Sequence, residues 1–144
     1  VVLSEALYQE YEQFYKDLYA NAKFTVGEAV KVDKETFEVS VSYEKMHVFE
    51  DGIERYEDAV AEFVQVWTDA ALAGEEVPSD EEMNEQLFHT FKDCMVAELA
   101  EAEYDAPAGM IIRVELIDNV WTANHEDILN LESALFDFEK LYDN

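Results

Sequence analysis

The sequence predicts an α+β domain in which about four helices pack on a small antiparallel sheet of three to four strands. Four segments repeat apolar residues at three- and four-residue spacing, as amphipathic helices do, and other segments alternate apolar with polar residues, as half-buried strands do. The composition is 49% hydrophobic and 13% aromatic, unlike that of disordered acidic chains. A chain of 144 residues is typical of one domain, so we expect residues 1–144 to form a single acidic α+β domain.

The first predicted helix covers residues 3–23. Its buried stripe is expected to comprise Leu3, Leu7, Tyr11, Phe14 and Leu18. A second row at helical spacing lies beside this stripe and contains Tyr8, Tyr15 and Tyr19. Two interpretations of this row stay open: a broad buried face, or an edge for a homodimer or another partner, since tyrosine suits interfaces.

Two strands are expected next, "TVGEAVKVD" at 25–33 and "TFEVSVSYE" at 36–44, joined by a short polar turn. In the second strand, every other residue from Phe37 to Tyr43 is apolar, and the residues between them are Glu or Ser. This alternation indicates an antiparallel sheet with one face in water.

A pair of helices is predicted in the middle of the chain. The first runs from Ile53 to Ala73 and ends at Gly74, the residue favoured after a helix. Its core stripe is expected to comprise Ile53, Tyr56, Val60, Phe63, Val64, Trp67 and Ala71. Pro78 interrupts the chain, and Ser79 with Glu82 three residues later forms a capping box for the next helix. That helix is expected to reach Tyr104 with Met83, Leu87, Phe91, Cys94, Met95 and Leu99 facing inward.

The last third of the chain predicts one strand, a short partner strand and a helix. "MIIRVELI" is the strand, and a turn at 118–119 leads into "VWTA". Asn124 is expected to cap a final helix whose inward residues are Ile128, Leu131, Leu135, Phe138 and Tyr142. The predicted order is therefore α-β-β-α-α-β-(β)-α.

The charge is the most unusual property of the sequence. Asp and Glu number 35 against nine Lys and Arg, a net charge of −26. Self-repulsion on this scale opposes compaction. The net charge is also larger than a small domain needs to stay soluble. Adaptation to high salt would favour Asp over Glu, whereas this chain has 23 Glu and 12 Asp. We therefore expect the charge to serve binding.

The negative charge is concentrated in the central helices. Residues 50–105 carry −16, compared with −4 for residues 1–49 and −6 for residues 106–144. Carboxylates spaced three and four residues apart on a helix repel one another, and only Arg55 and Lys92 lie within this segment to offset them. The predicted partner-binding residues are Glu54, Glu57, Asp58, Glu62, Asp69, Glu75, Glu76, Asp80, Glu81, Glu82, Glu85 and Asp93.

In size, charge and acidic helices, the chain resembles DNA-mimic proteins, a group that includes phage anti-restriction proteins, some anti-CRISPR proteins and inhibitors of uracil-DNA glycosylase. A charge of −26 equals that of about 13 base pairs of duplex. The resemblance lies in overall charge, size and acidic helices, and no residue motif ties the sequence to one family. It implies an acidic surface that occupies the nucleic-acid channel of a basic protein.

The sequence offers little support for catalysis or cofactor binding. "FEDGIERYED" contains a glycine but lacks the alternating acids of a calcium loop, and Glu44–His47 is the single Glu-x-x-His pair where a di-iron site needs two. The three histidines have no Ser or Cys companion at a recognisable spacing, and Cys94 lies on an apolar helix face as a buried, inert thiol would. We expect a protein that is not an enzyme and holds no cofactor and no metal.

A single cysteine indicates a reducing compartment, and neither a membrane span nor a signal pattern is apparent. The sequence therefore predicts a cytoplasmic protein that binds neither membranes nor nucleic acid directly. The expected function is a DNA-mimic inhibitor of a host nucleic-acid-binding protein, above all a restriction or CRISPR nuclease. An immunity protein or antitoxin that neutralises a basic nuclease toxin is the alternative.

Overall fold

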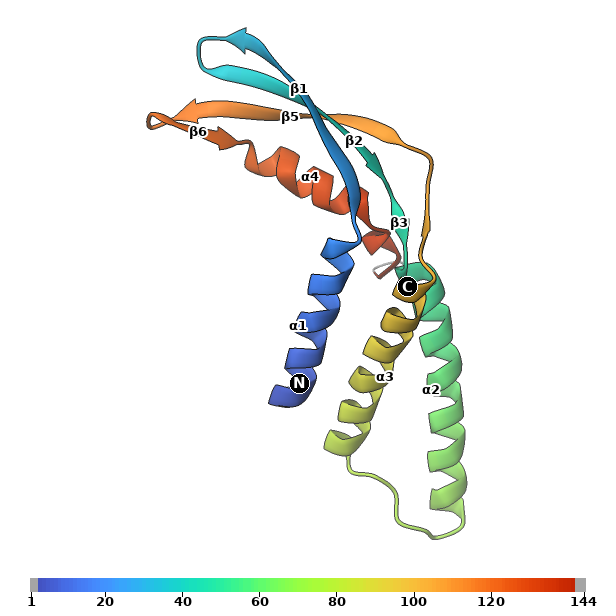
Figure 1. The fold of residues 1–144 in the computed structure, drawn as a ribbon. Coiled ribbons are helices and arrows are strands. Elements are labelled where there is room, and N and C mark those ends of the chain that lie inside the picture. Colours follow the sequence, from blue (N-terminus) through green and yellow to red (C-terminus); the bar gives the residue numbers. More distant parts are fainter. Residues whose placement is uncertain (1–2, 142–144) are drawn as a thin grey trace. The chain divides into compact units, whose positions relative to one another are not determined.

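The computed structural model describes residues 3–141 and confirms the α+β fold class. Four helices accompany a four-stranded antiparallel sheet and a two-stranded sheet among these residues (Figure 1). The chain divides into two compact units, each assembled from two stretches of sequence. We call them the helical unit, Val1–Ala20 with Val48–Ala102, and the sheet unit, Asn21–His47 with Glu103–Asn144.

The helical unit consists of α1 (Glu5–Ala20), α2 (Phe49–Leu72) and α3 (Asp80–Ala100). Its apolar core gathers where α1 meets the start of α2 and the end of α3. The buried apolar residues are Leu7, Phe14, Leu18, Val48, Phe49 and Met95. The rings of Phe14 and Phe49 meet edge to face with centroids 6.5 Å apart. The distal half of α2 is more open, because there it has only α3 for cover, whereas α3 also contacts α1 through Glu85 and Phe88.

The C-terminal end of α2 and the start of α3 follow from local sequence, as predicted. Gly74 adopts a φ of 73°, and its amide donates to the Ala71 carbonyl while that of Glu75 donates to the Ala70 carbonyl. These two bonds satisfy carbonyls that the helix end leaves free, and glycine takes this conformation without the steric cost of a Cβ. Ser79 and Glu82 then form the expected capping box at the start of α3.

A close backbone approach joins α2 to α3 at Gly52. A Cβ at this position would lie 2.5 Å from the Met95 sulfur. Met95 is fully buried, so its side chain has little room to move aside. The glycine therefore sets how closely the two helices pack.

The sheet unit contains β1 (Lys23–Asp33), β2 (Thr36–Glu44), β5 (Ala108–Ile117) and β6 (Val120–Ala123) in the order β1-β2-β5-β6, all antiparallel. Val26, Val41 and Met110 pair across three strands and so share one face. Positive φ angles at Asp118 and Asn119 form the tight turn between β5 and β6.

A short helix and a small second sheet complete this unit. α4 (His125–Leu135) is capped by Asn124 and lies against β5 and β2. Asp127 in its first turn accepts hydrogen bonds from the backbone and the guanidinium of Arg113 on β5. This bonding holds the pKa of Asp127 below its ordinary value. β3 (Met46–His47) pairs with β4 (Glu103–Tyr104), and the 3₁₀ helix η1 (Phe138–Leu141) follows α4.

Several sequence-based boundaries and burial assignments were wrong. Tyr104 belongs to β4 and not to the third helix, and Phe138 lies in η1 because the last helix ends at Leu135. Val64 is 51% exposed and Ala71 is exposed as well, although both were assigned to a core stripe. The buried apolar face of α2 is narrower than the predicted core stripe, because α2 packs against a single helix along its distal half. Tyr142 lies outside the described residues.

We expect Gly52→Ala to lower the free energy of unfolding by about 1–2 kcal/mol. The added methyl overpacks the contact with Met95, and this cost exceeds the gain of about 1 kcal/mol in helix propensity. Urea unfolding of Gly52→Ala, Met95→Ala and the double variant measures the effect. Gly52→Ala should destabilise less, or should stabilise, when Met95 is already truncated. Equal effects in both backgrounds would contradict the assigned contact.

Candidate functional site

Two of the three lysine and arginine side chains of the helical unit are used at helix–helix contacts. This unit has 20 Asp and Glu against three Lys and Arg, a net charge of −17. Arg55 on α2 pairs through its Nε with Glu98 on α3, and its second contact is Glu101 at 3.5 Å. The hydrogen bond to Glu98 raises the pKa of the Arg55 guanidinium. Because Glu98 is only 8% exposed, its carboxylate needs this partner.

The other two cations of this unit also have carboxylate partners. Lys92 on α3 lies 3.3 Å from Glu10 on α1 and 2.5 Å from Asp93. Partial burial opposes the charge on Lys92, but these carboxylates raise its pKa. Lys16 pairs with Glu12 one turn away on α1 at 3.4 Å. No lysine or arginine of the described helical unit therefore remains for the outer face of α2.

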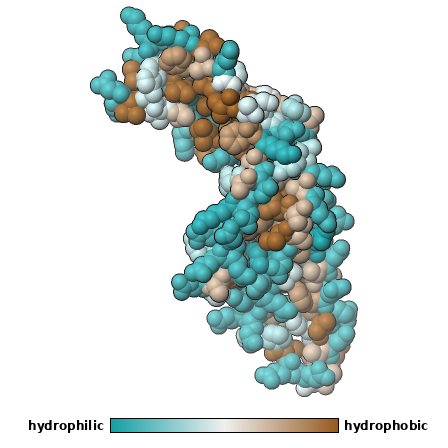
Figure 2. Space-filling model, viewed as in Figure 1, coloured by the Kyte–Doolittle hydropathy of each residue, from teal (hydrophilic) through white to brown (hydrophobic). Residues whose placement is uncertain are grey.

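Besides Glu50 at the start of α2, six carboxylates line that outer face. With about 100° of rotation per residue, they fall within a sector of about 140°, on the side of α2 away from its apolar residues. All six are exposed, and within residues 3–141 none forms an ion pair. The α2 stripe comprises Asp51, Glu54, Glu57, Asp58, Glu62 and Asp69. Asp69 accepts a hydrogen bond from Gln65. Hydrophilic side chains dominate the visible face of the helical unit in Figure 2.

The other predicted site residues lie on the hairpin tip and on α3. Glu75, Glu76, Asp80 and Glu81 are exposed. Glu82 is engaged in the capping box, and Glu85 accepts a 2.6 Å hydrogen bond from Ser4.

Asp93, near the middle of α3, contacts Lys92 and lies 3.6 Å from His89. The α3 carboxylates thus turn partly towards α1. The structure brings five of the predicted residues together on α2, with Asp51 as an addition that sequence reasoning missed.

Within the described residues, no group of three or more His, Cys, Asp or Glu is arranged to hold a metal ion. His47 lies 2.8 Å from Asp105 and 3.9 Å from Asp137 in the sheet unit. Cys94 is half-buried, and this burial raises the pKa of its thiol, which disfavours the nucleophilic thiolate. Across residues 3–141, no helix has the length and apolar character to span a bilayer.

Comparisons with known proteins identify the fold only. No family model matches the chain, and no curated protein matches it in sequence. Among solved structures, it is similar to one from Bacillus subtilis subsp. subtilis str. 168 described as a "putative lipoprotein (ycdA)", with a TM-score of 0.61 and 13% identity. The similarity covers 92% of this chain and 38% of that chain, so the present chain spans well under half of its neighbour.

Neutralising part of the α2 stripe is expected to stabilise the isolated protein. The variant carries Glu54→Gln, Glu57→Gln, Asp58→Asn and Glu62→Gln and leaves the bonded Glu82 and Glu85 intact. Each relieved like-charge pair contributes a few tenths of a kcal/mol, so the gain should approach about 1 kcal/mol in urea unfolding at about 10 mM salt.

The matched control changes four exposed carboxylates of the sheet unit to Gln, namely Glu28, Glu35, Glu38 and Glu103. It alters the net charge equally but relieves no repulsion on α2, so its gain should be smaller. A lower urea midpoint for the stripe variant would mean that these carboxylates are paired within the protein.

Proposed function

We propose that this protein is a DNA-mimic inhibitor that occupies the nucleic-acid-binding channel of a basic protein, with defence nucleases of the restriction or CRISPR type as the favoured targets. The observation that carries the proposal is the α2 stripe, where six exposed carboxylates have no cationic partner among residues 3–141. An ordinary solvated helix face mixes charges of both signs. This face contains one sign only.

The spacing of the stripe supports the comparison with DNA. From Asp51 to Asp69 the helix rises about 27 Å, which gives about one carboxylate per 5 Å of axis. A DNA strand carries one phosphate per about 3.4 Å. Further exposed carboxylates at Glu75, Glu76, Asp80 and Glu81 continue the negative surface around the tip of the hairpin. A basic channel would therefore meet a rigid row of charges at about two-thirds of the density of a single DNA strand.

The stripe would act by steering and exclusion. Negative charge on this scale accelerates encounter with a basic cleft, and the effect falls as salt screens it. Once bound, α2 fills the volume that the duplex needs, and the helical backbone keeps its carboxylates in place. Inhibition then requires no chemical step, and the proposal places the protein in the cytoplasm beside its target.

A second candidate, a binding module of the cell envelope, is favoured by the fold shared with the B. subtilis structure described as a "putative lipoprotein". Cell fractionation of the complete gene product separates the two candidates. A cytoplasmic location agrees with a mimic of DNA. An envelope location would contradict it, because a nuclease channel would then be out of reach.

The direct test is a competition with DNA. Immobilised protein captures basic proteins from a host lysate, and each captured protein is purified and bound to a fluorescent duplex of about 20 base pairs. Titration with the wild-type protein should displace the duplex, less efficiently as salt rises. The four-site stripe variant should lose most of the displacement, because it removes four of the six charges that meet the channel.

The sheet-unit control variant should displace the duplex as well as the wild type does. Equal displacement by the stripe variant would remove α2 from the interface. A ternary complex in which the duplex stays bound at every salt concentration would overturn mimicry and favour an immunity-type contact outside the channel.

A further inference from the structure

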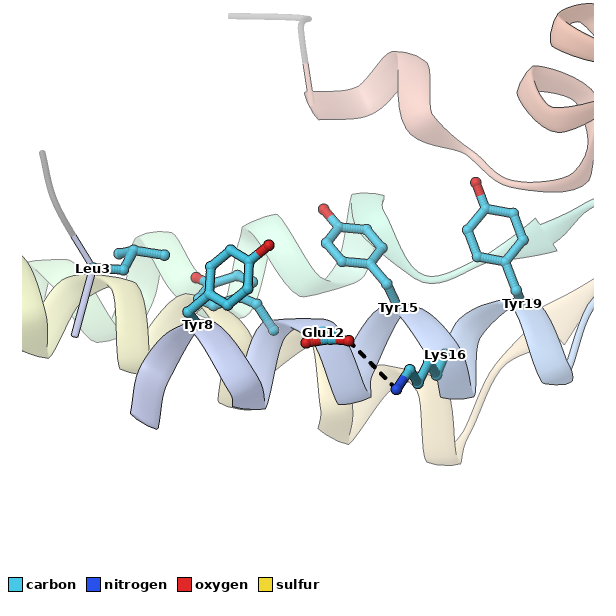
Figure 3. Close-up of a pocket in the computed structure, with 7 residues that line it drawn as sticks. Leu3, Tyr8, Glu12, Tyr15, Lys16 and Tyr19 are labelled. Atoms are coloured by element: carbon cyan, nitrogen blue, oxygen red, sulfur yellow. Dashed lines mark ion pairs between the residues drawn. The ribbon is translucent and has the colours of Figure 1, made fainter. Parts of the chain in front are cut away.

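A groove with apolar walls runs along α1, on a part of the helical unit distinct from the α2 stripe. It has a volume of about 620 Å³, and its lining includes Leu3, Tyr8, Tyr11, Tyr15 and Tyr19. Figure 3 shows Tyr8, Tyr15 and Tyr19 rising from the same side of α1, with Glu12 and Lys16 beside them. Tyr8 is 62% exposed, Tyr15 41% and Tyr19 45%, so three large rings present substantial area to solvent.

The groove has a fixed floor. The Tyr11 hydroxyl donates a 2.6 Å hydrogen bond to the Phe88 carbonyl of α3, and burial raises the pKa of this tyrosine. Leu7, Phe14 and Leu18 are buried on the neighbouring face of α1, about 100° of helical rotation from the row, and hold the helix in the core. The tyrosine row therefore stands on a helix that is fixed by packing, which lowers the entropy cost of binding to it.

Charge determines what can cover these rings. The helical unit carries −17, and the exposed carboxylates of Glu5 and Glu12 lie on α1 beside the row. An anionic segment would be repelled, and a neutral one would gain nothing from this field. A cationic segment gains from the field and from the rings, because the face of a tyrosine ring attracts cations.

We infer that the tyrosine row binds an arginine-containing segment of the partner, with guanidinium groups stacked on Tyr8, Tyr15 and Tyr19. Arginine is favoured over lysine because its planar group stacks on aromatic rings and is more weakly hydrated. Glu12 lies close enough to the row to pair with such an arginine in exchange for Lys16, its partner at 3.4 Å in the free protein. The inference rests on the proposed function in one respect, the positive charge of the partner.

The test uses synthetic peptides and does not require the partner. Oligo-arginine and oligo-lysine of about ten residues, and a neutral Leu-Ser peptide, are titrated into the protein. Isothermal titration calorimetry gives Kd for the wild type and every variant, and NMR shifts of ¹³C-labelled tyrosine rings locate the binding on the wild type. Oligo-arginine should shift the ring signals of Tyr8, Tyr15 and Tyr19 and bind more tightly than oligo-lysine. Changing the three tyrosines to Ala should weaken oligo-arginine binding about tenfold without altering the net charge.

Changing the same tyrosines to Leu keeps an apolar surface and serves as the matched variant. It should lose the preference for arginine over lysine. Unchanged Kd values in the Ala variant, tighter binding of the neutral peptide, or ring shifts that depend on protein concentration alone would each overturn the inference. The last result would identify the row as a contact between two copies of the chain. None of these outcomes affects the DNA competition with the stripe variant, so the two proposals fail separately.

Discussion

The pairing of Arg55 with the buried Glu98 is the interaction on which the helical unit depends. A carboxylate in a helix–helix contact is tolerated when a cation and hydrogen bonds compensate for lost hydration. The unit has three lysine or arginine side chains for 20 carboxylates, and each of the three is engaged. Arg55 and Lys92 join helices to each other. The outer face of α2 is left without compensation, so the distribution of the cations defines the acidic surface.

The helical unit offers a partner two different surfaces, the α2 stripe and the tyrosine row on α1. The α2 stripe offers long-range attraction and few apolar atoms, and salt should weaken it. The tyrosine row on α1 offers apolar area and ring faces, which act at short range and depend less on salt. The α2 stripe would set the association rate of the complex, while the tyrosine row would set its lifetime and selectivity. Interfaces commonly combine these features, because area or charge alone does not give specificity.

Much of the fold could be predicted because its signals are local. Gly74 and the Ser79–Glu82 capping box are short-range motifs, and the alternation in 36–44 identified β2 with its observed bounds. The two-residue strands β3 and β4 were missed because two residues cannot establish a period. The start of α2 was placed too late at Ile53, since Gly52 interrupts the pattern for a reason visible only in space, its contact with Met95.

The sequence predicted which carboxylates share a face of α2, but not which carboxylates have partners elsewhere in the chain. Helical rotation alone places Glu54, Glu57 and Asp58 on one face of α2. It does not reveal that Glu85 bonds Ser4 or that Lys92 reaches Glu10, because those partners are about 80 residues away in sequence. The chain also leaves the helical unit after Ala20 and returns at Val48 without a change in composition that would indicate it.

The thermal unfolding midpoint of the wild-type protein, followed from about 10 mM to 1 M NaCl, tests most directly whether the carboxylates are uncompensated. Repulsion among them is screened once the Debye length falls to about 8 Å, so the midpoint should rise steeply up to about 0.15 M salt. The rise should be the same in KCl, since screening does not depend on the identity of the cation. A midpoint that stays constant or falls with salt would show that the carboxylates are paired within the protein and would contradict the account.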